Sequence, residues 1–241
     1  MSFLATRSLA VGSPVLRKPV FFAGLLLLAL GFSVIAPEPA TGTASAGTAD
    51  AGSELEIIAP GGSDIDLANE CFSYFGSSEK PVTMRTSEFS VTARRIDYDR
   101  KRQELSAGGD VFLVSEEIEF RTEELLVELE KESFTATGGF TLTSGEMELT
   151  GRRLAASIPV GALIATEEVN WRFRDLRGEA EELVYRKDEG KVYLSGTPVA
   201  YWGENYMEGT MMVLHLETGR ITITGPVKSK LQRQGGGTGG D

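Results

Sequence analysis

A repeat of 29 residues runs through roughly the last 150 residues of this chain, and no other feature limits the fold as strongly. Two apolar series show its register: Ile96, Leu125, Leu154, Leu183 and Met212, and, nine residues further along each unit, Leu105, Phe134, Leu163, Val192 and Ile221. Five units follow one another without a net insertion. Such self-similarity predicts one supersecondary unit stacked five times.

Apolar residues fall at every second position inside each unit, which is the periodicity of a β-strand with one dry face. In the first unit, the segment 104–113 alternates in this way, with Glu104, Ser106 and Asp110 on the polar side. Polar, turn-forming stretches such as 99–102 separate the two halves of a unit. Each unit is therefore predicted to be a hairpin of two antiparallel strands, which gives about ten strands or more.

A stack of twisted hairpins with one dry face must curl or split into two packed layers. Small residues recur where such strands would bend: Ala93, Thr122, Gly151, Ala180 and Gly209. We therefore predict an all-β fold, a twisted antiparallel β-jelly roll or sandwich built from five 29-residue hairpin repeats. A β-helix is the alternative for a repeat of about thirty residues.

The N-terminal residues have the layout of an export signal. Arg7, Arg17 and Lys18 precede the uncharged run Val20–Ala36, and Ala44-Ser45-Ala46 is a candidate cleavage site. Because the run is at the lower limit of length for crossing a bilayer, we expect residues 1–46 to be either a signal peptide or an N-terminal membrane anchor. Both interpretations place the rest of the chain outside the cytoplasm.

Composition divides the remaining chain into three parts. Residues 47–80 are rich in Ala, Gly, Ser and Thr, and we expect a flexible linker or arm. Residues 81–231 contain the repeats and are expected to form one domain. Residues 232–241 are rich in Gly and are expected to be a disordered tail.

Charge and residue counts argue against several functions. The formal net charge is −11, and it becomes −13 once Arg7, Arg17, Lys18 and Glu38 of the leader are removed, so nucleic acid is not an expected partner. The single His and the single Cys leave few options for nucleophilic catalysis. His215 is expected to be a solvent-facing strand residue, and Cys71 lies in the expected arm. We predict no enzyme activity, no catalytic residue, no metal site and no cofactor.

The repeat units resemble those of the LptA/OstA-like family of lipopolysaccharide transport proteins. The family pattern is a small residue, then an apolar residue and Tyr-Asp, a turn, and an apolar-x-Ala-x-Gly-x-Val-x-Leu strand. The residues that carry the resemblance in the first unit are Ala93, Ile96, Tyr98 and Asp99, followed by Leu105, Ala107, Gly109, Val111 and Leu113. The resemblance covers about residues 85–231.

The resemblance implies a jelly roll that is open at both ends and has an apolar interior. It implies periplasmic transport of lipopolysaccharide, or a similar glycolipid, along an LptA-like bridge between the inner and outer membranes. It also implies edge-to-edge β pairing with other OstA-like domains of the inner-membrane and outer-membrane Lpt components, or with further copies of the chain. Two alternatives stay open: a membrane-anchored LptC-like member of the same system, and an envelope scaffold that polymerises by strand addition without moving lipid.

The resemblance assigns lipid binding to the inner apolar face, whereas the plain alternative is a sandwich core in which the same residues pack against one another. We favour a partly open groove. The residues of this face are Ile96, Tyr98, Leu105, Val111, Leu125, Val127, Phe134, Phe140, Leu154, Leu163, Val169, Trp171, Leu183, Tyr185, Val192, Leu194, Met212, Leu214, Ile221 and Val227.

Two units depart from the pattern. Glu167 stands where the other units have Gly, and Pro198 occupies a Val position, with Val199 and Tyr201 shifted in phase. We expect the inner face to bend or open there. Six arginines near strand ends are candidates for phosphate contacts, or else are ordinary solvated charges: Arg94, Arg95, Arg152, Arg153, Arg172 and Arg174.

Overall fold

The structure is a computed structural model that describes residues 56–86, 89–116 and 118–231. The predictions for residues 1–46 and 232–241 concern residues outside this part of the chain. No helix in the described residues is long and apolar enough to span a membrane. The described strands are β1 (Glu56–Ile58), β2 (Ser63–Asp66), β3 (Cys71–Phe75), β4 (Val82–Arg85), β5 (Phe89–Ala93), β6 (Arg95–Asp99), β7 (Glu104–Ser115), β8 (Ile118–Glu128), β9 (Ser133–Ser144), β10 (Met147–Gly151), β11 (Arg153–Ser157), β12 (Ala162–Phe173), β13 (Leu176–Arg186), β14 (Lys191–Ser195), β15 (Val199–Trp202), β16 (Asn205–Glu208), β17 (Met211–His215), β18 (Arg220–Thr224) and β19 (Lys228–Lys230).

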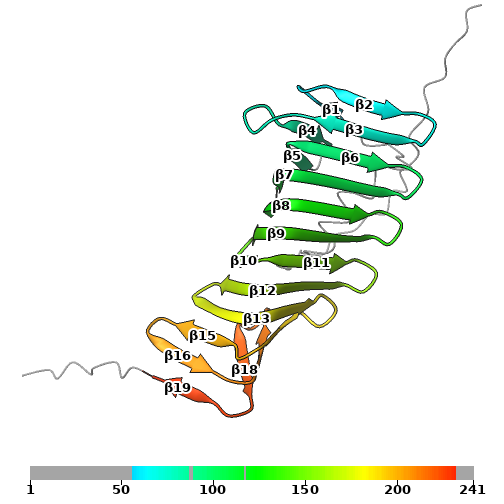
Figure 1. Cartoon of the computed structure of the whole chain (residues 1–241). Coiled ribbons are helices and arrows are strands. Elements are labelled where there is room, and N and C mark those ends of the chain that lie inside the picture. The colour runs from blue at the N-terminus through cyan, green and yellow to red at the C-terminus, as the bar shows by residue number, and fades with distance from the viewer. Residues whose placement is uncertain (1–55, 87–88, 117, 232–241) are drawn as a thin grey trace, which may run out of the picture.

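The strands form two antiparallel layers that share their longest members. The first sheet has the order β2-β3-β6-β7-β8-β9-β11-β12-β13-β14-β17-β18. The second sheet has the order β1-β4-β5-β7-β8-β9-β10-β12-β13-β15-β16-β19. The strands lie side by side along the length of the molecule, with β2 near one end and β19 at the other (Figure 1). The predicted twisted antiparallel β-jelly roll is confirmed.

The long strands pass from one sheet to the other through a bulge, and we call the line of bulges the corner. In β7, residues 109 and 110 lie opposite the single residue 123 of β8, and this two-against-one pairing recurs between β9 and β8 and between β12 and β13. A β-bulge of this kind bends a strand sharply. The first corner residue of each unit has a left-handed backbone, with φ of 78° at Gly109, 82° at Gly138, 65° at Glu167, 77° at Gly196 and 91° at Gly225.

Glu167 therefore adopts the same left-handed backbone as the glycines at this position and preserves the corner of its unit. The inner face does not open there, contrary to the sequence prediction. A non-glycine residue pays a conformational penalty in this region of the backbone. We expect Glu167→Gly to raise the free energy of unfolding by about 1 kcal/mol, measured by urea denaturation. The exposed pair that it removes, 3.9 Å between Arg153 Nε and Glu167 Oε1, contributes little to stability.

The matched control for this prediction is Gly138→Ala at the equivalent corner position. A Cβ at Gly138 would lie 2.7 Å from Glu123 Cβ, and the backbone φ is +82°. We expect this variant to lose more than about 1 kcal/mol of stability. Destabilisation by Glu167→Gly would contradict the role given to the corner.

The second departure, at Pro198, also leaves the alternation of buried and outward-facing residues unchanged. The sequence prediction that the inner face bends or opens there is therefore wrong. Pro198 is buried in its Val position, Ala200 is fully buried, and Val199 and Tyr201 are only half-buried. What changes is the strand itself, because β14 ends at Ser195 and β15 begins at Val199, where β7, β9 and β12 run through the corner unbroken.

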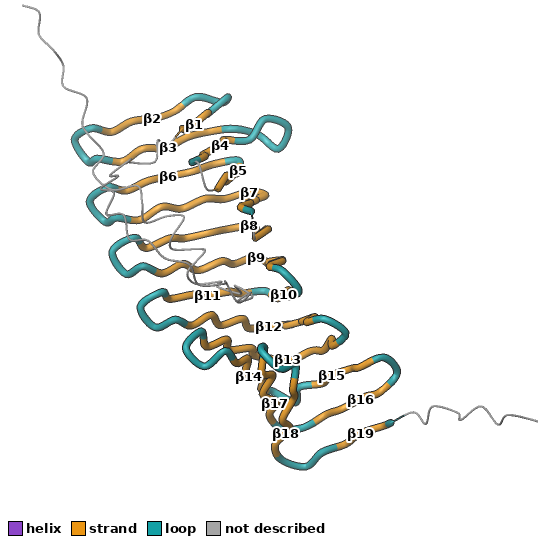
Figure 2. The backbone as a smooth tube through the Cα atoms, turned by 180° about the vertical axis from the view of Figure 1, so that it is seen from behind, coloured by secondary structure: helices purple, strands orange, loops and turns teal. Residues whose placement is uncertain are grey.

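The segment expected to be a flexible arm contains ordered strands, so the boundary at residue 81 is wrong. Strands β2 and β3 form a hairpin that pairs with β6, and β1 pairs with β4. The turns of the first sheet line up along one side of the stack, including the turn between β2 and β3 (Figure 2).

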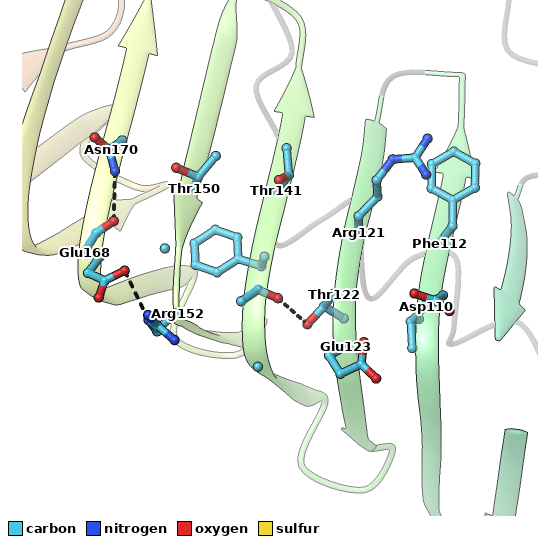
Figure 3. Close-up of a pocket in the computed structure, with 15 residues that line it drawn as sticks. Asp110, Phe112, Arg121, Thr122, Glu123, Thr141, Thr150, Arg152, Glu168 and Asn170 are labelled. Atoms are coloured by element: carbon cyan, nitrogen blue, oxygen red, sulfur yellow. Dashed lines mark hydrogen bonds and ion pairs between the residues drawn. The ribbon is translucent and has the colours of Figure 1, made fainter. Parts of the chain in front are cut away.

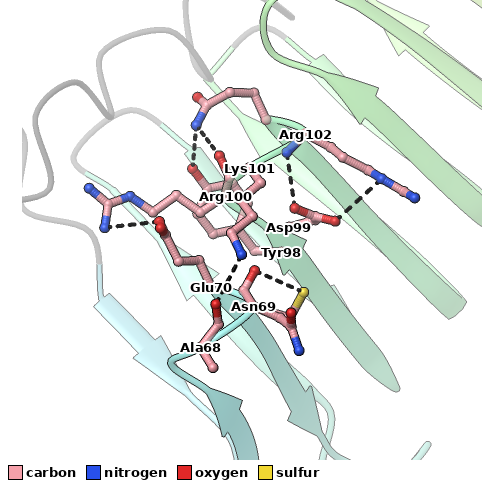
Figure 4. Close-up of polar contacts among 10 residues, drawn as sticks. Ala68, Asn69, Glu70, Tyr98, Asp99, Arg100, Lys101 and Arg102 are labelled. Atoms are coloured by element: carbon pink, nitrogen blue, oxygen red, sulfur yellow. Dashed lines mark hydrogen bonds and ion pairs between the residues drawn. The ribbon is translucent and has the colours of Figure 1, made fainter.

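Contacts between neighbouring turns attach the β2–β3 hairpin to the repeats (Figure 4). Lys101 Nζ donates a hydrogen bond to the carbonyl of Ala68 over 2.9 Å, and Arg100 N donates to the carbonyl of Glu70 over 3.1 Å. The Arg100 guanidinium also pairs with the Glu70 carboxylate at 3.4 Å. The stack of strands therefore begins before residue 81.

Candidate functional site

The inner faces of the two sheets form one continuous apolar surface, which we call the inner wall. Of the residues predicted for it, all but Tyr98, Ile221 and Val227 are between 0 and 7 % exposed. Tyr98 and Ile221 are partly buried and pack against this core. The structure therefore brings nearly all of the predicted residues together.

Val227 is the exception, and its assignment to the inner wall is wrong. It is 55 % exposed and lies between β18 and β19, at the C-terminal end of the stack. The equivalent residue of the first unit, Val111, has strands of the second sheet on both sides. In the part of the chain that the structure describes, β19 is the last strand, so no further strand covers this position.

Sequence reasoning missed much of the wall that the second sheet contributes. Its middle row runs across the strands through pairs of directly opposed residues: Met84, Val91, Leu113, Phe120, Leu142, Leu149, Trp171, Gly178, Ala200 and Met207. Phe120 and Leu149 lie in this row, and they are themselves 29 residues apart. The repeat period that identified the first sheet would therefore have found them as well.

The two sheets pack directly against each other, so the interior in this structure is a closed core and not the partly open groove that we expected. Phe120 of the second sheet meets Phe134 of the first sheet edge-on, with ring centroids 6.2 Å apart. Phe120 also lies 6.4 Å from the ring of Phe140. The side of the inner wall away from the corner ends in a row of residues near the turns. We call this row the mouth row, and in the second sheet it includes Phe173 and Leu176.

Few polar groups interrupt the inner wall. Thr122 is buried at the corner, where its hydroxyl lies 2.9–3.2 Å from the carbonyls of Glu124, Thr137 and Gly139. Burial raises the pKa of the Tyr185 phenol, and the nearby Asp188 carboxylate acts in the same direction. Tyr185 therefore stays neutral at ordinary pH, so it adds no charge to the wall.

The outer faces are polar, and the six arginines considered for phosphate binding all lie in ion pairs there. Their partners are Glu123 for Arg94, Asp97 for Arg95, Glu168 for Arg152, Glu167 for Arg153, Glu148 for Arg172 and Glu146 for Arg174. These pairs favour the interpretation as ordinary surface charges over a phosphate site.

A groove of about 570 Å³ crosses the outer face of the second sheet beside the corner. Figure 3 shows the Arg121 guanidinium over the Phe112 ring, and Arg152 beside Glu168. Charged and hydroxyl side chains dominate this surface, so it lacks the apolar lining that a hydrocarbon chain requires.

The residues considered for catalysis are not brought together. His215 is at the end of β17, and Cys71 is in β3 near the opposite end of the stack, where its Sγ lies 3.7 Å from the Asn69 carbonyl oxygen. Within residues 56–86, 89–116 and 118–231, no three His, Cys, Asp or Glu side chains are placed to hold a metal ion.

Bent strands that join two sheets around a continuous apolar interior define a β-jelly roll of the LptA/OstA-like class. The family model described as LptA/(LptD N-terminal domain) LPS transport protein matches residues 90–220. Since this match covers more than half of the chain, the protein belongs to that lipopolysaccharide transport family.

One solved structure among those similar to this chain is the crystal structure of LptH, the LptA homologous periplasmic component of the lipopolysaccharide transport device from Pseudomonas aeruginosa. Its sequence identity is 10 %, the alignment covers 75 % of this chain and 96 % of that one, and the TM-score is 0.23. No curated protein matches the chain.

Proposed function

We propose that this protein is a periplasmic component of lipopolysaccharide transport that holds the acyl chains of the lipid between its two sheets. The observation that carries the proposal is the continuous inner wall in a member of a lipopolysaccharide transport family. Burial of each CH₂ group contributes about 0.8 kcal/mol, so an acyl chain that replaces contacts between the sheets gains affinity without specific chemistry. Equivalent apolar positions recur along the stack and supply successive places for the chain.

We propose further that the chain acts as a bridge by joining other OstA-like domains, or copies of itself, at its two ends. Within the described residues, each sheet ends in edge strands that pair on one side only, β1 and β2 at one end and β18 and β19 at the other. Unpaired edges invite strand addition. A join at these edges would continue both sheets and extend the inner wall from one molecule to the next.

The chemistry of the two ends supports this proposal. Asp64 lies in β2, whereas Arg220, Lys228 and Lys230 lie in β18 and β19. Large apolar side chains are also exposed at the ends, among them Ile58, Ile65 and Leu67 at the first, and Val227 and Leu231 at the second. Opposite charge and exposed apolar surface are both expected of ends that dock.

Photo-crosslinking in cells tests whether lipopolysaccharide occupies the interior. We expect p-benzoylphenylalanine at Phe134, which is 2 % exposed on the inner wall, to form adducts with lipopolysaccharide. The same group at Thr135, the next residue and on the opposite face of β9, should form few. The pair Leu163 and Ile164 repeats the comparison one unit further along. Adducts with protein alone at both inner positions would favour the scaffold over the carrier.

A further inference from the structure

We propose that the indole N–H of Trp171 binds an acyl carbonyl of the lipid inside the jelly roll. This inference rests on the proposed function, and it adds a position and a chemical group to it. The ligand feature is the oxygen of an ester or amide that links an acyl chain to its head group, and not the hydrocarbon alone.

Trp171 carries a buried donor without an acceptor. The side chain is 3 % exposed, and no hydrogen-bond partner for Nε1 exists among the described residues. Nearly all buried polar groups in folded proteins have a partner, so an unpaired one requires an explanation. Because the indole nitrogen can only donate, the missing partner must be an acceptor.

The surroundings of Trp171 offer no such acceptor from side chains. It lies in the middle row of the second sheet, directly between Leu149 and Gly178. The other members of that row, from Met84 to Met207, have no oxygen or nitrogen atom in their side chains that could accept the hydrogen bond. The donor therefore has no side-chain acceptor in its row, and in this buried setting a carbonyl oxygen gains more from a hydrogen bond than it would in water.

The orientation of the ring leaves its N–H edge beside small residues. A Cβ at Gly178 would lie 2.0 Å from the Val199 carbonyl oxygen, and 2.7 Å from Cε2 and 2.6 Å from Cζ2 of Trp171. The Val199 carbonyl does not accept a hydrogen bond from Nε1. Cε2 is bonded to Nε1, so the edge that carries the N–H lies over Gly178. The next residue of the row is Ala200, and Gly178 and Ala200 are the two smallest members of this row. No long side chain of the row covers the donor.

The depth of Trp171 suits a carbonyl close to a head group. Phe173 and Leu176, in the mouth row, are two residues along their strands from Trp171 and Gly178. Two residues of strand correspond to about 6.6 Å. A lipid whose head group stays in water at the mouth would place its first carbonyl at about this depth, with the chain beyond it along the inner wall.

A pair of lysophosphatidylcholines tests the proposal, because one carries an ester-linked chain and the other an ether-linked chain of the same length. They differ only by the carbonyl. Binding to the full-length protein is measured by competition with a fluorescent fatty acid. We expect the unmodified protein to bind the ester lipid about threefold to tenfold more tightly than the ether lipid. Trp171→Phe, which keeps the ring and removes the N–H, should reduce this ratio to about one.

Trp202→Phe is the matched control, because it makes the same chemical change at a tryptophan that is 57 % exposed. This variant should keep the preference for the ester. Equal affinity of the two lipids for the unmodified protein, or the same ratio in Trp171→Phe, would overturn this inference and leave the proposed function standing. Failure of both lipids to bind the unmodified protein would overturn the inference together with the carriage of acyl chains.

Discussion

Replacement of Phe120 with alanine is expected to lower the free energy of unfolding by about 3–5 kcal/mol. The side chain is 1 % exposed, and it contacts aromatic rings of both sheets, Phe134 in the first and Phe140 in the second. Its removal leaves a cavity at the contact between the sheets. For a domain of this size, the melting temperature should fall by roughly 6–20 °C, which calorimetry or circular dichroism measures.

Phe112→Ala is the control for this prediction, because Phe112 lies on the outer face of the same sheet. It is half-buried, and its main contact is the Arg121 guanidinium, 3.9 Å from the ring centroid. We expect a loss of about 0.5–1 kcal/mol. If the two variants lost equal stability, the interior would be hydrated in solution, and the closed packing of the two sheets would be wrong.

Reversal of the charges at the C-terminal end is expected to weaken end-to-end association about tenfold or more. The variant combines Arg220→Glu, Lys228→Glu and Lys230→Glu, all in the edge strands β18 and β19. Like charges would then face Asp64 and Glu56 of the next molecule. Analytical ultracentrifugation at low ionic strength measures the effect, because salt screens exposed charges.

Two further variants separate a docking effect from a general effect of charge. Glu56→Lys with Asp64→Lys, added to the reversed C-terminal end, should restore association. Arg153→Glu with Arg172→Glu changes the charge in the middle of the stack and should leave association unchanged. Equal weakening by the middle and end variants would contradict docking at the edges.

The 29-residue period predicted the jelly roll and most of the inner wall, because side chains at equivalent positions of stacked strands share one face. Composition misled in one range. Residues 47–80 are rich in Ala, Gly, Ser and Thr, which favoured a linker, yet strands β1, β2 and β3 lie there. Pairing of β1 with β4 and of β3 with β6 overrides that local preference.

Other features depend on geometry that the repeat does not encode. The corner requires a residue with a left-handed backbone, and Glu167 adopts that conformation. A glycine at this position would have indicated the conformation in the sequence, whereas a glutamate does not. Val227 has the expected residue type at the expected spacing, but it is exposed because the stack ends beside it. The N–H of Trp171 is unpaired because the side chain is buried and because Gly178, directly opposite on the neighbouring strand, has no side chain. Neither fact is visible in the sequence of a single unit.

The central claim is that the space between the two sheets holds the acyl chains of lipopolysaccharide. The most direct measurement uses the Trp202→Phe protein, in which Trp171 is the only remaining tryptophan. Phospholipid with bromine atoms on its acyl chains should quench the emission of Trp171, and added lipopolysaccharide should restore it. Unchanged emission, or quenching that lipopolysaccharide does not relieve, would contradict the claim.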